Sequence, residues 1–411
     1  MFSPKCRPLF FNEQMTYYIC SIQKSIMNNF IFQNPTKIIF GKGTISSIKD
    51  EINKEKKILV TFGGGSVKSN GVYNQVVNAL DQHNYVEFWG IEANPDISTL
   101  RRAIEFGKIE KCDYVLAVGG GSVIDGSKLI AAGIVYEGDA WDIVLKRDWT
   151  NQPALPLSSV LTLPATGSEM NSGAVISNRE NREKFAFYSK HPVFSVLDPE
   201  TTYTLPKHQI ACGLADTFIH VMEQYLTTPH QSPLMDRWAE GILQTIVETA
   251  PVALNDQTNY NAMSSFMLSA TMALNGFVSM GVTQDWATHM IGHELTALLG
   301  LTHGHTLTIV LPGTMWVLRD EKGDKILQYG KRVFGIKCED GENKEATIKL
   351  IINKTEEFFK SLGLKIKLSE NGGDVATIEE IARRFNERGV KFGENRSVNS
   401  ETAKKILEWV L

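Results

Sequence analysis

The chain of 411 residues has few cysteines and no long apolar run. Its five cysteines are Cys6, Cys20, Cys112, Cys212 and Cys338. Because they form no C-x-x-C pair, they indicate neither a disulfide framework nor a zinc finger, and they fit a reducing cytoplasm. No apolar stretch reaches the roughly 20 residues that span a bilayer. We therefore predict a cytoplasmic protein that has no membrane partner.

An excess of charge of one sign is also missing. The 42 lysines and arginines nearly balance the 46 aspartates and glutamates, which gives a formal net charge of −4. Such a balance leaves no basic surface for nucleic acid or anionic lipid, so we expect no nucleic-acid partner. Hydrophobic residues at 43% and charged residues at 21% exclude a disordered or fibrous chain. At about 100–200 residues per domain, the length predicts two or three domains.

The pattern of predicted elements changes near residue 205. Before it, strands alternate with helices of about 10–15 residues, which is typical of βαβ units and a parallel sheet. The expected strands are 57–62, 85–89, 113–118, 160–163 and 193–197, with a hairpin over 175–189 and helices over 71–83, 97–109 and 125–132. After Pro206 helical periods dominate, over 207–225, 234–249, 260–277, 284–299 and 306–319. We expect an α/β plus all-α protein: a poorly ordered extension (1–26), a Rossmann-like parallel-sheet domain (27–205) and an all-helical domain (206–411).

Two glycine-rich turns each follow a predicted strand. They are Gly63-Gly64-Gly65-Ser66 and Gly119-Gly120-Gly121-Ser122. Neither is G-x-G-x-x-G, and the P-loop motif is absent from the sequence. Glycine lets the backbone approach an anion closely, and the start of the following helix offers free N–H groups. One such turn could be only a tight connection, but two at the carboxyl ends of parallel strands predict a pyrophosphate cradle for a dinucleotide.

The first glycine turn also bears on the choice of coenzyme. Sites that prefer NAD place a carboxylate near the ribose hydroxyls. No Asp or Glu follows Phe62 as far as Lys68. The small glycines, the Ser66 hydroxyl and the Lys68 ammonium could instead accept an extra phosphate, unless Lys68 is simply a solvated surface charge. We therefore predict that NADP(H) is preferred and that NAD(H) is possible.

Aspartate and histidine are concentrated in the second half of the chain. The candidates are Asp216, His220, His289, His293, His303 and His305. The first four form two pairs spaced i, i+4 on predicted helices, and such side chains lie on one face about 5–6 Å apart between Cβ atoms. Any single histidine could be a hydrogen-bonded core residue, but two pairs and the loop that carries His303 favour a metal site. One carboxylate with two or three imidazoles suits one divalent ion, Fe²⁺ or Zn²⁺.

These motifs, in this order, resemble the iron-containing (group III) alcohol dehydrogenases, in the branch of butanol dehydrogenases and NADPH-dependent aldehyde reductases. The stretches that carry the resemblance are 40–44, 63–68, 119–125, 163–171, 213–216 and 285–294. The resemblance implies an oxidoreductase that transfers hydride between NADP(H) and a primary alcohol or aldehyde such as butanol or butanal. It also implies a homodimer or larger homo-oligomer.

The resemblance further implies individual roles. The metal ligands would be Asp216, His220, His289 and His303. His293 would line the cleft without binding the metal, and we take it as a candidate proton relay and catalytic residue. Besides the two glycine turns and Lys68, the cofactor-binding residues would be Asp125, then Thr162, Leu163 and Ser168 near the nicotinamide, and Lys184 on its ribose.

Two other functions are compatible with parts of the pattern. A lyase of the dehydroquinate-synthase type has a similar layout and also uses nicotinamide and metal, but it needs a more cationic cleft than Met290, Leu295 and Leu298 suggest. A non-catalytic nucleotide-binding protein would not need the aspartate and histidine set. His293-Glu294 begins like a zincin motif but lacks the second histidine, so a metalloprotease is excluded.

Overall fold

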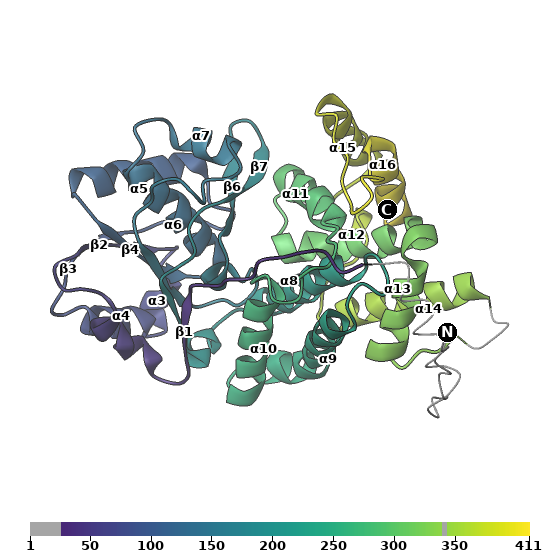
Figure 1. Cartoon of the computed structure of the whole chain (residues 1–411), viewed down its shortest axis with the longest axis horizontal. Coiled ribbons are helices and arrows are strands. Elements are labelled where there is room, and N and C mark those ends of the chain that lie inside the picture. The colour runs from purple at the N-terminus through teal and green to yellow at the C-terminus, as the bar shows by residue number, and fades with distance from the viewer. Residues whose placement is uncertain (1–25, 339–342) are drawn as a thin grey trace, which may run out of the picture.

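The structure is a computed structural model that describes residues 26–338 and 343–411. A half that contains the sheet precedes a mostly helical half (Figure 1). The α/β plus helical fold class is therefore confirmed. The extension expected over residues 1–26 lies outside the described residues except for its last position. The domain boundary near residue 205 stays a prediction.

In the described part of the chain, six strands form a parallel sheet in the order β1-β8-β5-β4-β2-β3. Their bounds are β1 (Lys37–Phe40), β2 (Lys57–Phe62), β3 (Asn84–Phe88), β4 (Tyr114–Gly119), β5 (Leu157–Leu161) and β8 (Phe194–Leu197). Successive side chains of a strand point to opposite faces. In β4, Val115 and Ala117 pack into one apolar cluster, and Leu116 and Val118 into another. Because both faces are covered, the central strands are continuous apolar runs.

Short helices and a hairpin complete this half. The helices are α2 (Ile48–Glu51), α3 (Ser66–Ser69), α4 (Val72–Ala79), α5 (Ile97–Ile109), α6 (Gly121–Ile134) and α7 (Ala140–Leu145), with 3₁₀ turns η2 (Thr44–Ser47), η3 (Ser168–Met170) and η4 (Pro199–Thr202). The expected hairpin is present as the antiparallel pair β6 (Gly173–Asn178) and β7 (Glu183–Tyr188). Helix α6 begins at Gly121 and not at Asp125, because the glycine turn itself forms the first turn of the helix.

The helix predicted over 207–225 is present as α8 (Lys207–Tyr225), and the helical half is built around it. The others are α9 (Pro233–Asn255), α10 (Tyr260–Ala273), α11 (Ala287–Leu299), α12 (His303–Val317), α13 (Arg319–Val333), α14 (Lys344–Ser361), α15 (Val375–Glu387) and α16 (Ser400–Trp409), with the 3₁₀ turn η5 (Ser369–Asn371). From Ile210 to Tyr225 every residue of α8 is buried, and α9, α10 and α12 pack around it. Polar side chains on this helix are therefore held inside the protein. Among the helices of the described ranges, none combines the length and apolarity needed to cross a membrane.

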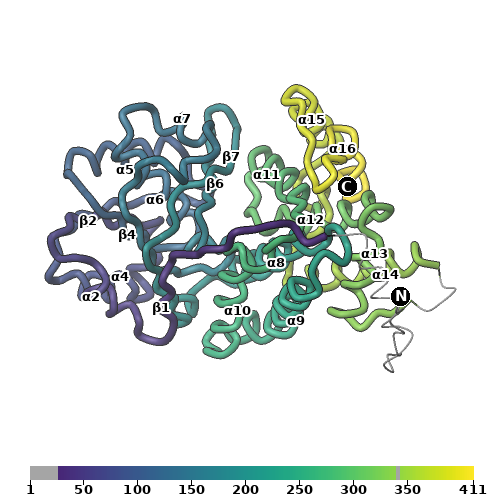
Figure 2. Tube along the Cα trace, viewed as in Figure 1, coloured from purple at the N-terminus to yellow at the C-terminus, as the bar shows by residue number. Residues whose placement is uncertain are grey.

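The segment before β1 joins the two halves. Figure 2 shows it running from the helical half to the edge of the sheet. The Asn28 N–H donates to the Gly281 carbonyl at 2.8 Å, and the Asn34 side-chain amide donates to the Met170 carbonyl at 2.7 Å. This segment is therefore hydrogen-bonded both to a loop of the helical half and to η3 of the half that contains the sheet.

Candidate active site

The candidate metal ligands come from three helices. Asp216 and His220 lie one turn apart on α8, His289 lies in the first turn of α11, and His303 is the first residue of α12. The prediction that His303 lies in a loop is therefore wrong. Helix α12 begins three residues earlier than expected. Gly304 in its first turn allows close packing on α8, since a Cβ there would stand 2.2 Å from the Cys212 carbonyl oxygen.

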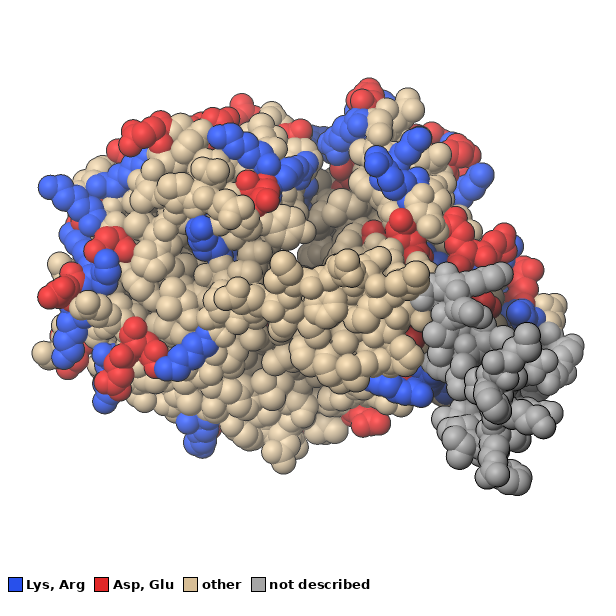
Figure 3. Space-filling model, in the orientation of Figure 1, with Lys and Arg blue, Asp and Glu red and all other residues tan. Residues whose placement is uncertain are grey.

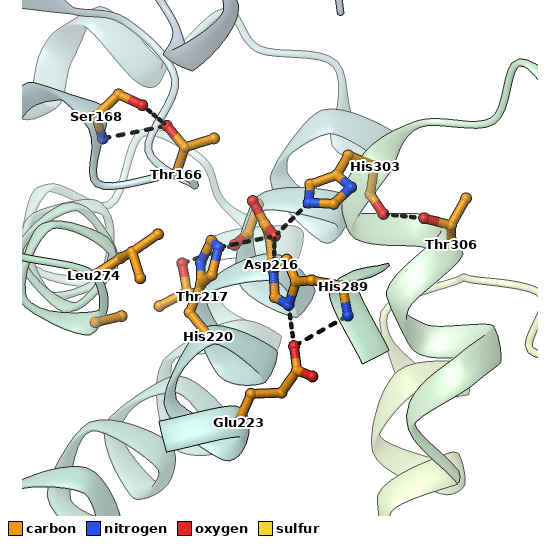
Figure 4. Close-up of polar contacts among 12 residues, drawn as sticks. Thr166, Ser168, Asp216, Thr217, His220, Glu223, Leu274, His289, His303 and Thr306 are labelled. Carbon is orange, nitrogen blue, oxygen red and sulfur yellow. Dashed lines mark hydrogen bonds and ion pairs between the residues drawn. The ribbon is translucent and has the colours of Figure 1, made fainter. Parts of the chain in front are cut away.

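The four side chains meet at one carboxylate oxygen (Figure 4). Asp216 Oδ1 lies 3.7 Å from His220 Nε2, 3.9 Å from His289 Nε2 and 3.9 Å from His303 Nε2. The donor atoms of Asp216, His289 and His303 all lie within 4.8 Å of one another. His220 is outside that mutually close set, although its ring stacks on that of His289 with centroids 4.7 Å apart. One small cation could therefore contact several of these atoms.

The chemistry of this cluster suits a divalent cation. Asp216 Oδ1 and His289 Nε2 are buried without a hydrogen-bond partner, which is rare for polar atoms in a folded protein. Burial lowers the pKa of both His220 and His289 to about 4. At neutral pH these imidazoles are therefore uncharged and keep a lone pair for a metal. The donor set of one carboxylate and imidazoles fits Fe²⁺ or Zn²⁺.

Glu223 is a residue of this cluster that the sequence did not reveal. It lies on α8 and is 3% exposed. Its carboxylate contacts Nδ1 of His289, whereas Nε2 of the same ring is the nitrogen that lies toward Asp216 (Figure 4). Burial and the nearby Asp285 carboxylate raise the pKa of Glu223. The only sequence signal was its position seven residues after Asp216, which places both on one side of the helix.

The two remaining histidines of the predicted group differ in position. The His293 ring is buried on α11, with its centroid 5.0 Å from that of His303, but it is outside the mutually close donor set. Burial holds the pKa of His293 well below its usual value. His305 is engaged elsewhere, since its Nε2 contacts the Lys365 carbonyl oxygen at 2.8 Å. This geometry favours His303 over His305 as a ligand, and the proton-relay role of His293 stays a prediction.

A cavity of about 730 Å³ lies between the halves, next to the cluster. Figure 3 shows a hollow in the surface at the level where β7 and α11 face each other. Of the predicted residues, Ser122, Asp125, Ser168, Lys184, His220, His289, His293 and His303 line the cavity. Apolar walls are provided by Phe187, Leu274, Trp286, Met290 and Phe392. A cavity of this size, in which apolar walls and polar groups face the same space, is typical of small-molecule sites.

The second glycine turn brings a loop against the start of α6. A Cβ on Gly120 would stand 2.9 Å from the Leu163 Cβ, and one on Gly121 would stand 2.3 Å from the Thr166 Oγ1. The Thr162 N–H donates to the Gly119 carbonyl at 3.0 Å. The absence of side chains at these glycines is therefore required for the close packing of the loop, whether or not the turn also binds an anion. The described residues that line the cavity do not include Gly119–Gly121, Thr162 or Leu163. Their roles in cofactor binding stay predictions.

Asp125 and Lys184 hold the cavity wall together. The buried Asp125 carboxylate accepts hydrogen bonds from Ser168 Oγ at 2.5 Å and from Val175 N at 2.9 Å. It therefore ties the hairpin and η3 to α6. Lys184 Nζ donates to Asn94 Oδ1 at 2.9 Å, and burial lowers the pKa of Lys184 to about 8. Lys184 is one of the cations that face the cavity.

The first glycine turn lies apart from the cavity lining. Gly65 has φ +104° and precedes Ser66, the first residue of α3. Lys68 Nζ sits 4.0 Å from the centroid of the Trp89 ring, which is a cation–π distance. Lys68 is therefore held over an aromatic ring and is more than a freely solvated charge. Coenzyme binding by Gly63, Gly64, Gly65, Ser66 and Lys68 stays a prediction.

Comparison with known proteins decides the family. Residues 35–199 match the model of the iron-containing alcohol dehydrogenases, and residues 210–411 match that of their C-terminal domain. The chain belongs to the iron-containing alcohol dehydrogenase family. This confirms the resemblance found in the sequence. Membership of this family identifies the chain as an oxidoreductase.

The relatives of this iron-containing alcohol dehydrogenase cover almost its whole length. It is 46% identical to the NADPH-dependent aldehyde reductase YqhD of Escherichia coli, over 93% of this chain and 99% of the relative. It is 41% identical to a probable NADH-dependent butanol dehydrogenase of Bacillus subtilis, with the same coverage. The crystal structure of Escherichia coli YqhD superposes with a TM-score of 0.92 at 45% identity, covering 94% of this chain and 100% of that one. An NADH-dependent butanol dehydrogenase A from Thermotoga maritima superposes with a TM-score of 0.88 at 36% identity, covering 94% and 99%.

Proposed function

We propose that this chain is a metal-dependent alcohol dehydrogenase and aldehyde reductase, which transfers hydride between NADP(H) and a primary alcohol or aldehyde such as butanol or butanal. The observation that carries the proposal is the Asp216 carboxylate oxygen. It is buried, lacks a hydrogen-bond partner and has three imidazole nitrogens 3.7–3.9 Å away, beside the cavity. The activities named for two relatives, an aldehyde reductase and a probable butanol dehydrogenase, support the same reaction.

The position of each residue in the site indicates the part it would take in the reaction. When bound, the divalent metal polarises the oxygen of an alcohol or aldehyde, and the nicotinamide carries the hydride. The metal would be held by Asp216, His220, His289 and His303. His293 lines the same cavity and would relay the proton that the oxygen gains or loses. The apolar walls at Trp286 and Met290 would exclude water and orient an alkyl chain.

The cavity fits an alkyl aldehyde better than a phosphate-bearing polyol. Its lining includes five large apolar side chains, and the cations that face it are Lys184 and Lys391. Lys184 is already hydrogen-bonded to Asn94. This composition, together with the family match, argues against a lyase of the dehydroquinate-synthase type. The cluster of buried metal-ligating groups argues against a non-catalytic nucleotide-binding protein.

Removal of the metal should abolish the activity. We expect the purified protein to oxidise NADPH in the presence of butanal. This activity should stop after a chelator has removed the metal, with the removal verified by elemental analysis. Addition of Fe²⁺ or Zn²⁺ should restore the rate, because the oxygen is activated only beside a divalent cation. An unchanged rate in the verified metal-free protein would contradict the proposal. A protein denatured by the chelator is identified by its circular dichroism and by the failure of both ions to restore activity.

We propose that NADP(H) is preferred over NAD(H). The chain offers no carboxylate in the stretch Gly63–Lys68, and the Lys68 ammonium is fixed over Trp89 beside the first glycine turn. The relatives are divided: YqhD is described as NADPH-dependent, and the butanol dehydrogenases as NADH-dependent. Rates with the two coenzymes, measured in parallel, decide between them.

A carboxylate placed at Gly64 should weaken this preference. A Cβ at Gly64 meets no atom within 4 Å, so Gly64→Asp adds a charge without a steric conflict. Repulsion between like charges near a solvated surface amounts to about 1 kcal/mol or more at contact distance, so the KM for NADPH should rise about five- to tenfold. The KM for NADH should stay within about twofold. Gly64→Ala is the matched control, and an equal rise in this variant would show that the effect is not electrostatic.

The homodimer or larger homo-oligomer stays a prediction, and so does the cytoplasmic location. Neither the fold nor the family match tests them.

A further inference from the structure

The Glu223 side chain contacts three nitrogen atoms in the first turn of α11. Its Oε1 accepts from the Thr288 N–H at 2.6 Å, and its Oε2 accepts from the His289 N–H at 3.2 Å. Oε2 also contacts Nδ1 of the His289 ring. The side chain is 3% exposed, so water does not compete for these bonds. One carboxylate on α8 thus caps the N-terminus of α11 and contacts the ring of His289, a candidate metal ligand.

The contact with the ring determines which nitrogen of His289 carries the proton. Neutral imidazole has one N–H donor and one acceptor nitrogen. Since Glu223 presents an acceptor oxygen to Nδ1, the proton belongs on Nδ1. The Nε2 lone pair is then free, and this atom is buried, unpartnered and 3.9 Å from Asp216 Oδ1. The opposite tautomer would point an N–H at the position where a cation must sit.

We propose that Glu223 is a positioning residue for the metal, which fixes the His289 ring in the tautomer and orientation that allow Nε2 to bind it. The inference rests on the proposed function. A carboxylate behind a metal-binding histidine commonly contributes about 10- to 100-fold in metal affinity. Here the same carboxylate also sets the start of α11, so the backbone of His289 and its ring are fixed together.

Glu223→Gln tests this with little change in shape. Gln has one acceptor oxygen where Glu has two, so the variant can no longer accept from Thr288 N and contact both nitrogens of His289 at once. With its oxygen toward Thr288, the amide NH₂ meets Nδ1, and the ring must carry its proton on Nε2. With its oxygen toward His289, the neutral amide holds the Nδ1 proton more weakly than a carboxylate does. We expect the dissociation constants for Zn²⁺ and Fe²⁺, measured by competition with a chelating dye, to rise about 10- to 100-fold.

The matched control is Glu240→Gln. Glu240 is also 3% exposed and accepts hydrogen bonds from Tyr225 and Gln328, away from the candidate ligands. It should lose stability without a change in metal affinity. Equal dissociation constants for the wild type and Glu223→Gln would overturn the inference alone. If the wild type itself binds neither ion, the proposed function fails and the inference falls with it.

A measurement on the wild type avoids dependence on any variant. In the metal-free protein with ¹⁵N-labelled histidine, the nitrogen shifts of His289 should show Nδ1 protonated and Nε2 unprotonated. A ring protonated at Nε2 would overturn the assignment. This readout reports the tautomer directly, so a purely structural role of Glu223 in capping α11 would not produce it.

Discussion

Asp216→Asn is expected to abolish metal binding and activity while leaving the metal-free protein at least as stable as the wild type. Loss of a residue that only orients a ligand already weakens metal binding about 10- to 100-fold, so loss of the shared carboxylate should weaken it more than about 100-fold. In the absence of a metal, however, Asp216 Oδ1 is a buried atom without a partner. Burying such a charge is unfavourable, so the neutral amide should raise the melting temperature of the metal-free protein.

Melting temperatures with and without metal check this prediction. A metal at about 100 times its dissociation constant stabilises the wild type by about 2.7 kcal/mol, and the variant should gain nothing. Asp236→Asn is the control: its carboxylate is paired with Lys325 at 2.6 Å and accepts from Gln328 at 2.8 Å. Breaking that buried pair should cost about 3–5 kcal/mol without affecting metal affinity. A large fall in stability for Asp216→Asn would show that the carboxylate is satisfied by the protein itself.

Much of the fold follows from local pattern. The strands 57–62 and 113–118 are apolar runs that end in glycine, and α5 and α8 have the predicted bounds. The two strands are buried on both faces and α8 is buried around its circumference from Ile210 onwards, so apolar residues occur at most positions. Helix α5 instead buries one face, which gives it the helical period of apolar residues. The starts of α6 and α12 could not be predicted. Both begin in glycine-containing turns, where low helix propensity is outweighed by close packing against Leu163 and Cys212.

The site was predictable only in part, for a related reason. Spacing of i, i+4 places Asp216 beside His220, because both lie on one helix. It cannot place His289 or His303, which reach the same oxygen from other helices. Glu223 contacts a residue 66 positions away, and an isolated glutamate in a helix gives no sign of such a partner. The role of the glycines that allow the helices to approach cannot be predicted from the sequence either, because it depends on which atoms lie opposite them in the fold.

Gly304→Ala should damage both stability and metal binding, although glycine carries no chemistry. The added Cβ would stand 2.2 Å from the Cys212 carbonyl oxygen and 3.2 Å from the Asp216 Cβ. The first of these is a backbone atom of the central helix, so α12 must move away from α8. Overpacking of this kind costs about 1–3 kcal/mol. His303 precedes the glycine directly, so the same movement draws its Nε2 away from Asp216 Oδ1 and weakens metal binding.

Gly241→Ala separates this steric effect from the general consequence of adding a methyl group to a helix. Gly241 lies in the exposed face of α9, and a Cβ there meets no atom within 4 Å. This substitution should stabilise the protein by about 0.4–1 kcal/mol, because it restricts the unfolded chain and favours the helix. Chemical denaturation and dye competition for Zn²⁺ measure both quantities on the two variants. Wild-type stability and affinity in Gly304→Ala would mean that α12 can adjust without moving His303. The approach of α12 to α8 would then have no part in forming the metal site.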